Sequence, residues 1–320
     1  MNRREPAPGF TKTMSAVTQQ PVAAPVGTPL TADKPNRLLG LLQLPAVGAL
    51  LLWMIVPLAL TVYFSFIRFS LLNPDVSGFA GFENYQYLAE DEAFWPSIIN
   101  TVILVGSVLV ITIVFGVLLA VLYDREFFGK NVATLLVIAP FFVMPTVSAL
   151  IWKNFIFHPD DGLIAFVLGK VGLRPIAWFT DFPLLSIIII VAWEWLPFAF
   201  LILFTSLKSL DSEQKEAASI DGANPIQLFF FIIVPHLQRA IGVVVMIETI
   251  FLLSIFAEIY TTTSGGPGHA SENLAFLVYS LGIQGFNVGT GSAGGILAVI
   301  LANIVAYFLV KMLAKNLKGR

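Results

Sequence analysis

The stretch that decides the fold is EQKEAASIDGANPIQLFFFIIVPHL, residues 213–237, which lies between two long apolar runs. Asp211, just before it, is expected to cap a helix in a variant of the capping box, together with Gln214 three residues further on. Gly222 suits a C-terminal cap that requires a positive φ. Because Pro225 cannot continue a helix, it ends the first one. The pattern therefore predicts a hairpin of two short helices.

The composition is typical of a protein embedded in a membrane. The 320 residues are 57% hydrophobic and only 12% charged, and an ordinary soluble domain carries about twice that charged fraction. The net charge of −2 and the lack of a basic block argue against a nucleic-acid partner. The absence of cysteine excludes disulfides and thiolate metal sites. Residues 1–37 hold six prolines and no apolar core, so a disordered tail is expected there.

Six stretches are long and apolar enough to cross a hydrocarbon core of about 30 Å, namely residues 38–66, 98–122, 131–157, 184–207, 240–262 and 293–313. All six are expected to be helices, because backbone polar groups inside lipid must pair within their own segment. The shorter run 274–286 is expected to lie as an amphipathic segment at the membrane surface. Kinks are predicted at prolines within these spans: Pro45, Pro57, Pro140, Pro145 and Pro197.

The basic residues predict the orientation. With the N-terminus inside, 14 of the 18 Lys and Arg residues fall in the cytoplasmic segments. This asymmetry places both termini and the hairpin, residues 208–239, in the cytoplasm. Lys153, on the opposite side, is expected to extend its amine towards the lipid headgroups. The prediction is a multi-pass membrane protein with both termini in the cytoplasm, and the family resemblance described next implies that this membrane is the bacterial cytoplasmic (inner) membrane.

The hairpin also carries a recognisable motif. Glu216-Ala217-Ala218, followed by Gly222 and then by the run 232–235 (IIVP), resembles the EAA loop of permease subunits in bacterial ATP-binding-cassette importers. The family usually has Leu where this run has Val. Three further stretches resemble the maltose-type sugar permeases: GFENYQYL with FWPSIINT (81–101), IWKNFIFHPDDGLI (151–164) and TTSGGPG (262–268). The resemblance covers about residues 38–319 and implies a six-helix permease domain over 38–320.

This resemblance implies the type I importer permease fold, in which an all-α polytopic chain of six transmembrane helices carries a cytoplasmic coupling-helix hairpin. The hairpin would dock in a groove of a cytoplasmic ATPase subunit. The residues expected at that contact are Glu216, Ala217, Ala218, Asp221 and Gly222. Glu216 would pair with polar groups at the rim, Ala217 and Gly222 would permit a close approach, and Asp221 would hold the turn. An ordinary amphipathic connector is the alternative interpretation.

The resemblance also implies partners. The sequence contains no G-x-x-x-x-G-K-[ST] motif, so ATP is not bound here by a P-loop. ATP and Mg²⁺ are therefore expected on the partner ATPase, with no cofactor on this chain. The expected assembly contains a second homologous permease, two ATPase subunits and an extracytoplasmic substrate-binding protein.

Acidic residues inside the spans are candidates for contact with cargo, because ionisable groups in the membrane are costly and usually face a cavity or a partner. Glu194 lies between Trp193 and Trp195, and a carboxylate beside indoles suits the hydroxyl groups and C–H faces of a sugar or polyol. A structural carboxyl group bonded to a neighbouring helix, or kept protonated, is the equal alternative. Glu258 and Tyr260, near the outer end of the fifth span, could border the mouth of the cavity.

Other polar residues are expected to have simpler roles. Glu248 is expected to be structural, and Asn303 is expected to join helices. The histidines are widely spaced, so no metal site is expected, and no nucleophile–base pair indicates a catalytic site. The outer turn expected to meet the substrate-binding protein, unless it is merely a turn, comprises Gly265, Gly266, Pro267 and Gly268.

The leading hypothesis is therefore an importer permease that forms half of a pathway for a sugar or polyol. The stretches FLLSIFAEIYTTTSGGPG (251–268) and NLAFLVY (273–279) resemble permeases for sugar alcohols such as sorbitol or mannitol. An ion-coupled secondary transporter is the alternative, since such proteins carry acids near the membrane midplane. A multi-pass enzyme is the third class, without a convergent catalytic group in the sequence.

Overall fold

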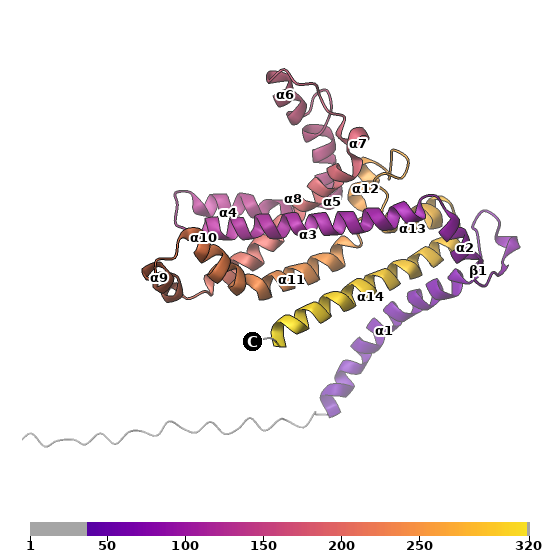
Figure 1. Cartoon of the computed structure of the whole chain (residues 1–320). Helices are drawn as coiled ribbons and strands as arrows, with labels where there is room; N and C mark the ends of the chain where they lie inside the picture. The colour runs from indigo at the N-terminus through magenta and orange to yellow at the C-terminus, as the bar shows by residue number, and fades with distance from the viewer. Residues whose placement is uncertain (1–36, 319–320) are drawn as a thin grey trace, which may run out of the picture. The chain divides into compact units, whose positions relative to one another are not determined.

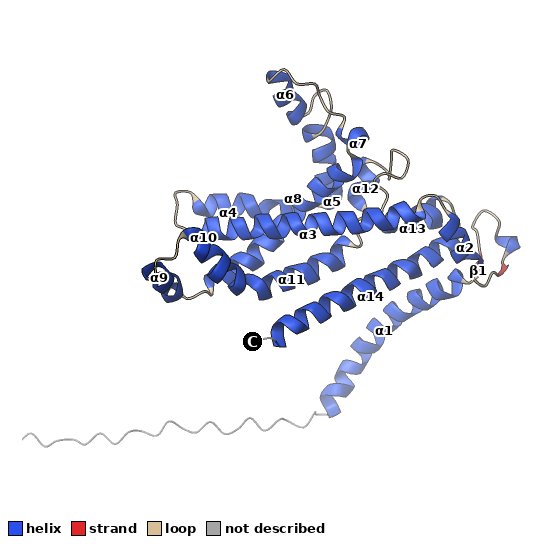
Figure 2. Ribbon diagram, in the orientation of Figure 1, coloured by secondary structure: helices blue, strands red, loops and turns tan. Residues whose placement is uncertain are grey.

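The computed structural model describes residues 37–318, most of which are helical (Figures 1 and 2). Residues 1–36 of the predicted tail lie outside the described residues. The long helices are α1 (Arg37–Ser65), α3 (Phe94–Asp124), α8 (Pro183–Lys208), α11 (Val234–Leu252) and α14 (Val288–Lys318). Strands β1 (Ile67–Arg68) and β2 (Gly78–Phe79) form a short antiparallel pair after α1.

Shorter elements connect the long helices. They are the α-helices α2 (Glu83–Glu90), α4 (Lys130–Ile138), α5 (Pro145–Ile151), α6 (Leu163–Lys170), α7 (Trp178–Asp181), α9 (Ser212–Ile220), α10 (Pro225–Leu228), α12 (Ala257–Thr262) and α13 (Leu274–Tyr279). Turns of 3₁₀-helix lie at Pro74–Val76 and Ala139–Phe142, and turns of π-helix at Trp152–Ile156, Phe229–Ile233 and Ser280–Gln284.

The described residues contain the apolar helices that six membrane crossings require. Five single helical segments have the necessary length and hydropathy: Gln43–Ser65, Phe94–Asp124, Pro183–Lys208, Pro225–Leu252 and Val288–Leu309. A sixth crossing is formed if the bent pair Lys130–Phe142 and Pro145–Ile156 counts as one span. The predicted number of six is recovered on that basis.

The third predicted span, 131–157, is broken rather than kinked. Its two halves meet at an angle of 109°, and Val143 and Met144 between them have extended backbone (ψ 131° and 138°). Pro145 disfavours helical backbone at the residue before it, and it begins α5 at a position where the missing N–H costs nothing. The break therefore follows from the spacing of Pro140 and Pro145, although its size exceeds the predicted kink.

The helical segment at the fifth predicted span, 240–262, differs from that range at both ends. A continuous helical segment begins at Pro225, passes through the π turn Phe229–Ile233, and ends at Leu252. Pro235 lies in the first turn of α11, where it does not interrupt the helix. The second helix of the hairpin and the long apolar helix are therefore one continuous helical segment. The helix α11 ends at Leu252. Within the break that follows, the Asn273 amide donates to the Ile255 carbonyl oxygen (2.6 Å), and α12 begins after that break.

The core lies between α3, α8 and α11, which run alongside one another (Figure 1). Gly116 of α3 permits the closest approach, because a Cβ at this position would lie 3.1 Å from Leu203 Cδ1 and 3.2 Å from Ala199 Cβ. The cluster nearer the hairpin includes Val117, Ala199, Leu203, Leu237 and Val244, and the cluster at the other end includes Leu104, Val108, Ile188, Leu252 and Ile259.

The run 274–286 is a packed element and not an amphipathic segment lying on a surface. It forms α13 and the π turn that follows, and both contact α14. Leu274, Phe276 and Leu277 are buried. The π turn lies so close to α14 that a Cβ on Gly291 would stand 2.5 Å from Gly282 Cα. Its length had excluded a full crossing, but the sequence pattern did not reveal its partners.

Candidate functional site

The first helix of the hairpin, α9, has a defined cap at each end. Asp211 Oδ1 accepts the Glu213 N–H (3.0 Å), which confirms the predicted N-cap. Gln214 contributes through its backbone N–H, which donates to the Asp211 carbonyl oxygen (3.2 Å), rather than through the side chain of a capping box. At the other end Gly222 has the predicted positive φ, 86°. The Ala223 N–H reaches the Ala218 carbonyl oxygen (2.9 Å), as in a Schellman motif.

The second helix begins with a capping box that the sequence interpretation missed. Asn224 Oδ1 accepts the Gln227 N–H (2.8 Å), and Gln227 Oε1 accepts the Asn224 N–H (2.9 Å). Pro225 occupies the first helical position, which requires no N–H donor. The signal was present in the sequence as Asn-Pro-Ile-Gln. The turn between the two helices is consequently fixed from both sides.

The residues predicted to dock are accessible. Glu216, Ala217, Asp221 and Gly222 are exposed and Ala218 is partly buried. A groove of ≈ 510 Å³ lies between α9 and the start of α11. It is lined by Gln214, Ala217, Ala218, Asp221, Phe231, Ile232, Pro235 and His236.

A second hollow, of ≈ 320 Å³, lies at the turn itself, next to Asp221 and Gly222. Four of the five predicted residues therefore line a concave surface. Large apolar side chains stand exposed on the same hairpin, because Ile220 is 86% and Phe231 77% exposed. Small residues, concavity and exposed apolar side chains together make this surface suitable for contact with another protein.

Inside the helical bundle, Glu194 of α8 and Glu258 of α12 are brought together. Both side chains are buried, with 6% and 2% exposure, and the Glu194 carboxyl group lies beside the Glu258 carboxyl group and beside the Ser148 hydroxyl group of α5. Trp152 follows Ser148 by about one turn. Within the described residues, Glu194 Oε1, Ser148 Oγ and Trp152 Nε1 are buried without a hydrogen-bond partner. Glu194 and Ser148 together offer an acceptor and a donor, the two kinds of group that a hydroxyl group can bind.

The two tryptophans flanking Glu194 point to different neighbours. Successive residues on a helix are about 100° apart around its axis, so Trp193 and Trp195, two positions apart, point about 200° away from each other. They therefore cannot cover the same face of a ligand. The Trp193 ring packs against Trp152 with centroids 5.8 Å apart, beside the buried cluster. The Trp195 ring packs against Phe251 at 5.3 Å. Trp193, rather than both indoles, is therefore placed next to the unpartnered polar atoms.

Tyr260 lies on α12 with Glu258 but on a more exposed side. Its ring stacks on Phe256 with centroids 5.5 Å apart and meets Tyr279 edge-on at 5.6 Å. About half of the Tyr260 side chain is exposed. The structure therefore separates Tyr260 from the buried carboxyl pair and places it in an aromatic group with α13.

The glycine-rich outer turn is anchored at its base and open at its tip. Gly265 is buried with a φ of 84°, and a Cβ there would lie 3.0 Å from the Phe276 ring. Ser271 Oγ donates to the Gly266 carbonyl oxygen (3.0 Å), whereas Pro267 and Gly268 are exposed. Of the four predicted contact residues, only these last two present themselves fully to solution.

The predictions for Glu248 and Lys153 have different outcomes. Glu248 is fully buried and accepts the Thr112 hydroxyl (2.7 Å), so it links α11 to α3 as a structural role requires. Lys153 does not extend to headgroups, because its amine donates to the carbonyl oxygens of Thr261 and Thr262. That prediction is wrong, since buried carbonyl groups at a helix end offer a closer partner than lipid.

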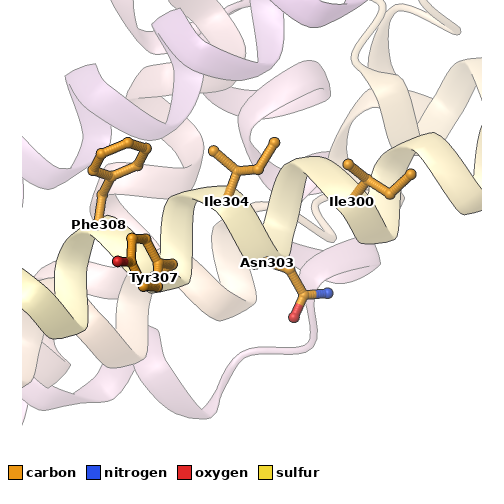
Figure 3. A pocket seen from close by; sticks show the side chains of 5 residues that line it. All are labelled: Ile300, Asn303, Ile304, Tyr307 and Phe308. Atoms are coloured by element: carbon orange, nitrogen blue, oxygen red, sulfur yellow. The ribbon is translucent and has the colours of Figure 1, made fainter.

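Asn303 is exposed on α14, where its amide donates to the Val299 carbonyl oxygen of the same helix (2.8 Å). Within the described chain it therefore does not join helices. Asn303 lines a depression of ≈ 350 Å³, and the lining residues, drawn in Figure 3, all come from α14. Because one helix alone forms this depression, it is a surface feature and not a substrate cavity. Between residues 37 and 318 no group of three acidic or histidine side chains is placed to hold a metal ion.

Comparison with known proteins agrees with these features. Residues 112–319 match the family described as the binding-protein-dependent transport system inner membrane component. The probable ABC transporter permease protein y4oQ of Sinorhizobium fredii is 32% identical over 252 residues, which cover 78% of this chain and 81% of that protein. The sulfoquinovosyl glycerol transport system permease protein SmoG of Agrobacterium fabrum is 32% identical over 272 residues, covering 84% and 87%.

A solved structure has the same architecture. A chain in the crystal structure of a bacterial alginate ABC transporter, in complex with an alginate pentasaccharide-bound periplasmic protein, superposes with a TM-score of 0.73. The match covers 86% of this chain and 93% of that chain at 22% identity. The predicted fold class, an all-α polytopic membrane protein with the type I importer permease fold, is thereby confirmed.

Proposed function

Because the chain belongs to the family of binding-protein-dependent transport system inner membrane components, we propose that it forms half of the translocation pathway for a sugar or polyol. The chain is a multi-pass inner-membrane subunit that serves transport rather than catalysis. In this proposal the hairpin 208–239 docks on a cytoplasmic ATPase, and ATP-driven closure of two such ATPases moves it.

The observation that carries the proposal is the doubly capped hairpin. Caps at Asp211, Gly222 and Asn224 hold the turn in one conformation. A force applied to the turn is therefore transmitted to the helices on either side and does not deform the turn itself. Its second helix continues without interruption to Leu252. A displacement of the turn therefore moves a membrane-spanning helix directly. Ala217 and Gly222 leave the backbone open to close contact, and burial of Ile220 and Phe231 would contribute about 25 cal/mol per Å² of apolar surface.

The buried cluster around Glu194 supports a polyhydroxylated cargo. Glu194 Oε1 and Ser148 Oγ, which are buried without a hydrogen-bond partner, would each gain a hydrogen bond with a cargo hydroxyl group, and leaving them unsatisfied costs about 1–3 kcal/mol apiece. The printed names of SmoG and of the alginate transporter refer to a sulfosugar glycerol compound and to an acidic oligosaccharide. A carbohydrate is accordingly the proposed class, with sorbitol and mannitol as candidates from the sequence resemblance.

The proposed assembly contains a second homologous permease and an extracytoplasmic substrate-binding protein that meets the tip Pro267–Gly268. Both termini face the cytoplasm, and ATP and Mg²⁺ are bound by the two ATPase subunits. Three observations of this chain support it: the apolar helices for up to six spans, an exposed hairpin with capped helices, and a glycine-rich turn that is anchored at its base.

Reconstitution of the complete complex in proteoliposomes tests the proposal. The binding protein, loaded in turn with members of a panel of sugars and polyols, should stimulate ATP hydrolysis and drive uptake of the ligand that it binds. Uptake that persists without ATP and collapses on addition of an uncoupler would instead establish the ion-coupled alternative. If the complex is assembled but no panel member stimulates ATP hydrolysis, a carbohydrate cargo is excluded.

A further inference from the structure

Three helices meet in a charged cluster at the cytoplasmic end of α3. Asp124, the last residue of α3, places Oδ2 2.7 Å from Lys215 Nζ of α9 and Oδ1 3.1 Å from Lys208 Nζ, at the end of α8. The side chains of Asp124 and Lys215 are only 25% and 24% exposed. Partly shielded pairs such as these are screened less by solvent than pairs on an open surface.

The position of Asp124 is unfavourable for α3 alone. A helix ends in a partial negative charge, so a basic residue is expected there and an acidic one is destabilising. Lys208 also brings its amine to 3.4 Å from the Asp124 carbonyl oxygen. The carboxylate is therefore stabilised by lysines from two other helices. A residue that breaks a local preference in this way indicates that the tertiary contact matters.

The coupling helix α9 is otherwise lightly attached. The helix contains no buried residue between Ser212 and Ile220. Among the ion pairs of the described residues, Lys215–Asp124 is the one that joins α9 to a membrane-spanning helix. The helix α9 follows the end of α8 after a three-residue turn, residues 209–211, whereas α10 continues into α11 as one helical segment through the π turn. The two halves of the hairpin are therefore connected to the membrane domain by different means.

We propose that Asp124 is a positioning residue that transmits displacement of α9 to α3 through Lys215. This inference rests on the proposed function and adds a second path to it. One path runs from α10 along the continuous helix into α11. The other runs from Lys215 to Asp124 and along α3 to Thr112, whose hydroxyl donates to Glu248 of α11 (2.7 Å). The two paths meet at this buried contact, so α3 and α11 move together.

The experiment uses the complete complex in proteoliposomes and measures cargo transported per ATP hydrolysed. Lys215→Gln and Asp124→Asn should each lower this ratio about five-fold, the size of effect that a partly shielded ion pair supports. The matched control is Lys208→Gln, which removes the other lysine of the cluster but leaves α9 tied to α3, and it should change the ratio less than about two-fold. The double variant of Asp124 and Lys215 should lose no more than either single variant.

Lys215→Arg, which keeps the positive charge, should keep the ratio of cargo to ATP near that of the unmodified complex. The ATPase subunits should still co-purify with every variant, because the docking surface is unchanged. An unaltered ratio in Lys215→Gln, equal losses in Lys208→Gln and Lys215→Gln, or a failure of Lys215→Arg to keep the ratio would each overturn the inference. These results differ from a failure of the proposed function, in which the unmodified complex itself would show no ATP-driven uptake.

Discussion

Lys153 Nζ lies 2.8 Å from the carbonyl oxygen of Thr262 and 3.1 Å from that of Thr261. These carbonyl groups end α12, and a cationic donor at a helix C-terminus satisfies acceptors that have no partner within the helix. Lys153 belongs to the π turn after α5, so it joins the third span to the last turn before the outer loop. The loop with Gly265–Gly268 is thus held from below by a residue of another span.

Lys153→Met is predicted to weaken the response to the substrate-binding protein, because two carbonyl groups of α12 lose their donor and the loop loses its support. Loss of about 1 kcal/mol should raise about five-fold the binding-protein concentration that gives half-maximal ATPase stimulation, with little change in the maximal rate. Lys153→Arg should keep most of the response. Lys170→Met is the control, since Lys170 is exposed on α6; equal shifts in the two Met variants would refute a specific role for Lys153.

Gly222→Val is predicted to abolish uptake and stimulated ATP hydrolysis while insertion into the membrane stays normal. The residue has a φ of 86° with open space around its Cβ position, so the substitution costs about 1–2 kcal/mol in backbone strain and distorts the docking turn. Gly129→Val is a matched control, because Gly129 has a φ of 78° and equally open surroundings in another turn. Uptake should survive that change. Comparable losses in both variants would mean that strain alone, and not docking, explains the effect.

Thr112→Val is predicted to lower the free energy of unfolding by about 1–3 kcal/mol, because it leaves the buried Glu248 carboxyl group without its donor. The measurement is thermal unfolding of the purified complex in detergent. Thr205→Val provides the comparison, since the Thr205 hydroxyl donates to Leu201 of its own helix at an exposed position and should contribute little. A smaller loss for Thr112→Val than for Thr205→Val would contradict the structural role of Glu248.

The orientation can be tested directly because the chain contains no cysteine. Ala270→Cys, beside the outer turn, should react with a membrane-impermeant maleimide in intact spheroplasts. Gln214→Cys, on the hairpin, should react only after the membrane is permeabilised. Both residues are exposed, so accessibility within the protein is matched. The reverse pattern of labelling would place the hairpin outside the cell and would contradict the coupling proposal.

The features that the sequence predicts well are those that depend on neighbouring residues. The caps at Asp211 and Gly222 rest on spacing within one helix, and the long spans rest on continuous apolar runs. Pro140 and Pro145 predict a bend in the third span. The size of the angle between its two halves, 109°, depends on how α5 packs against α8 and α12. The end of α11 at Leu252 is not predicted by the apolar run, and a contact within the break that follows comes from Asn273, 18 positions beyond Ile255.

The site residues show the same limit. Glu194 and Glu258 were both singled out, but nothing local indicates that they meet each other beside Ser148. Lys153 was misassigned because its partners lie more than 100 residues further along the chain. The contact between Asp124 and Lys215 spans 91 positions, and Asp124 has no local feature other than an unfavourable charge at a helix end. Such contacts become visible only in three dimensions.

The most direct test of the central claim is photo-crosslinking from the hairpin. A photo-reactive amino acid at Ala217, in the complete complex, should crosslink to the cytoplasmic ATPase, and the yield should change when the ATPase is trapped with ATP and vanadate. The same probe at Lys170 of α6 should give no such product. A crosslink at Ala217 that depends on nucleotide would support docking of the hairpin on a nucleotide-driven partner. Absence of any crosslink at Ala217, or equal yields at both positions, would contradict it.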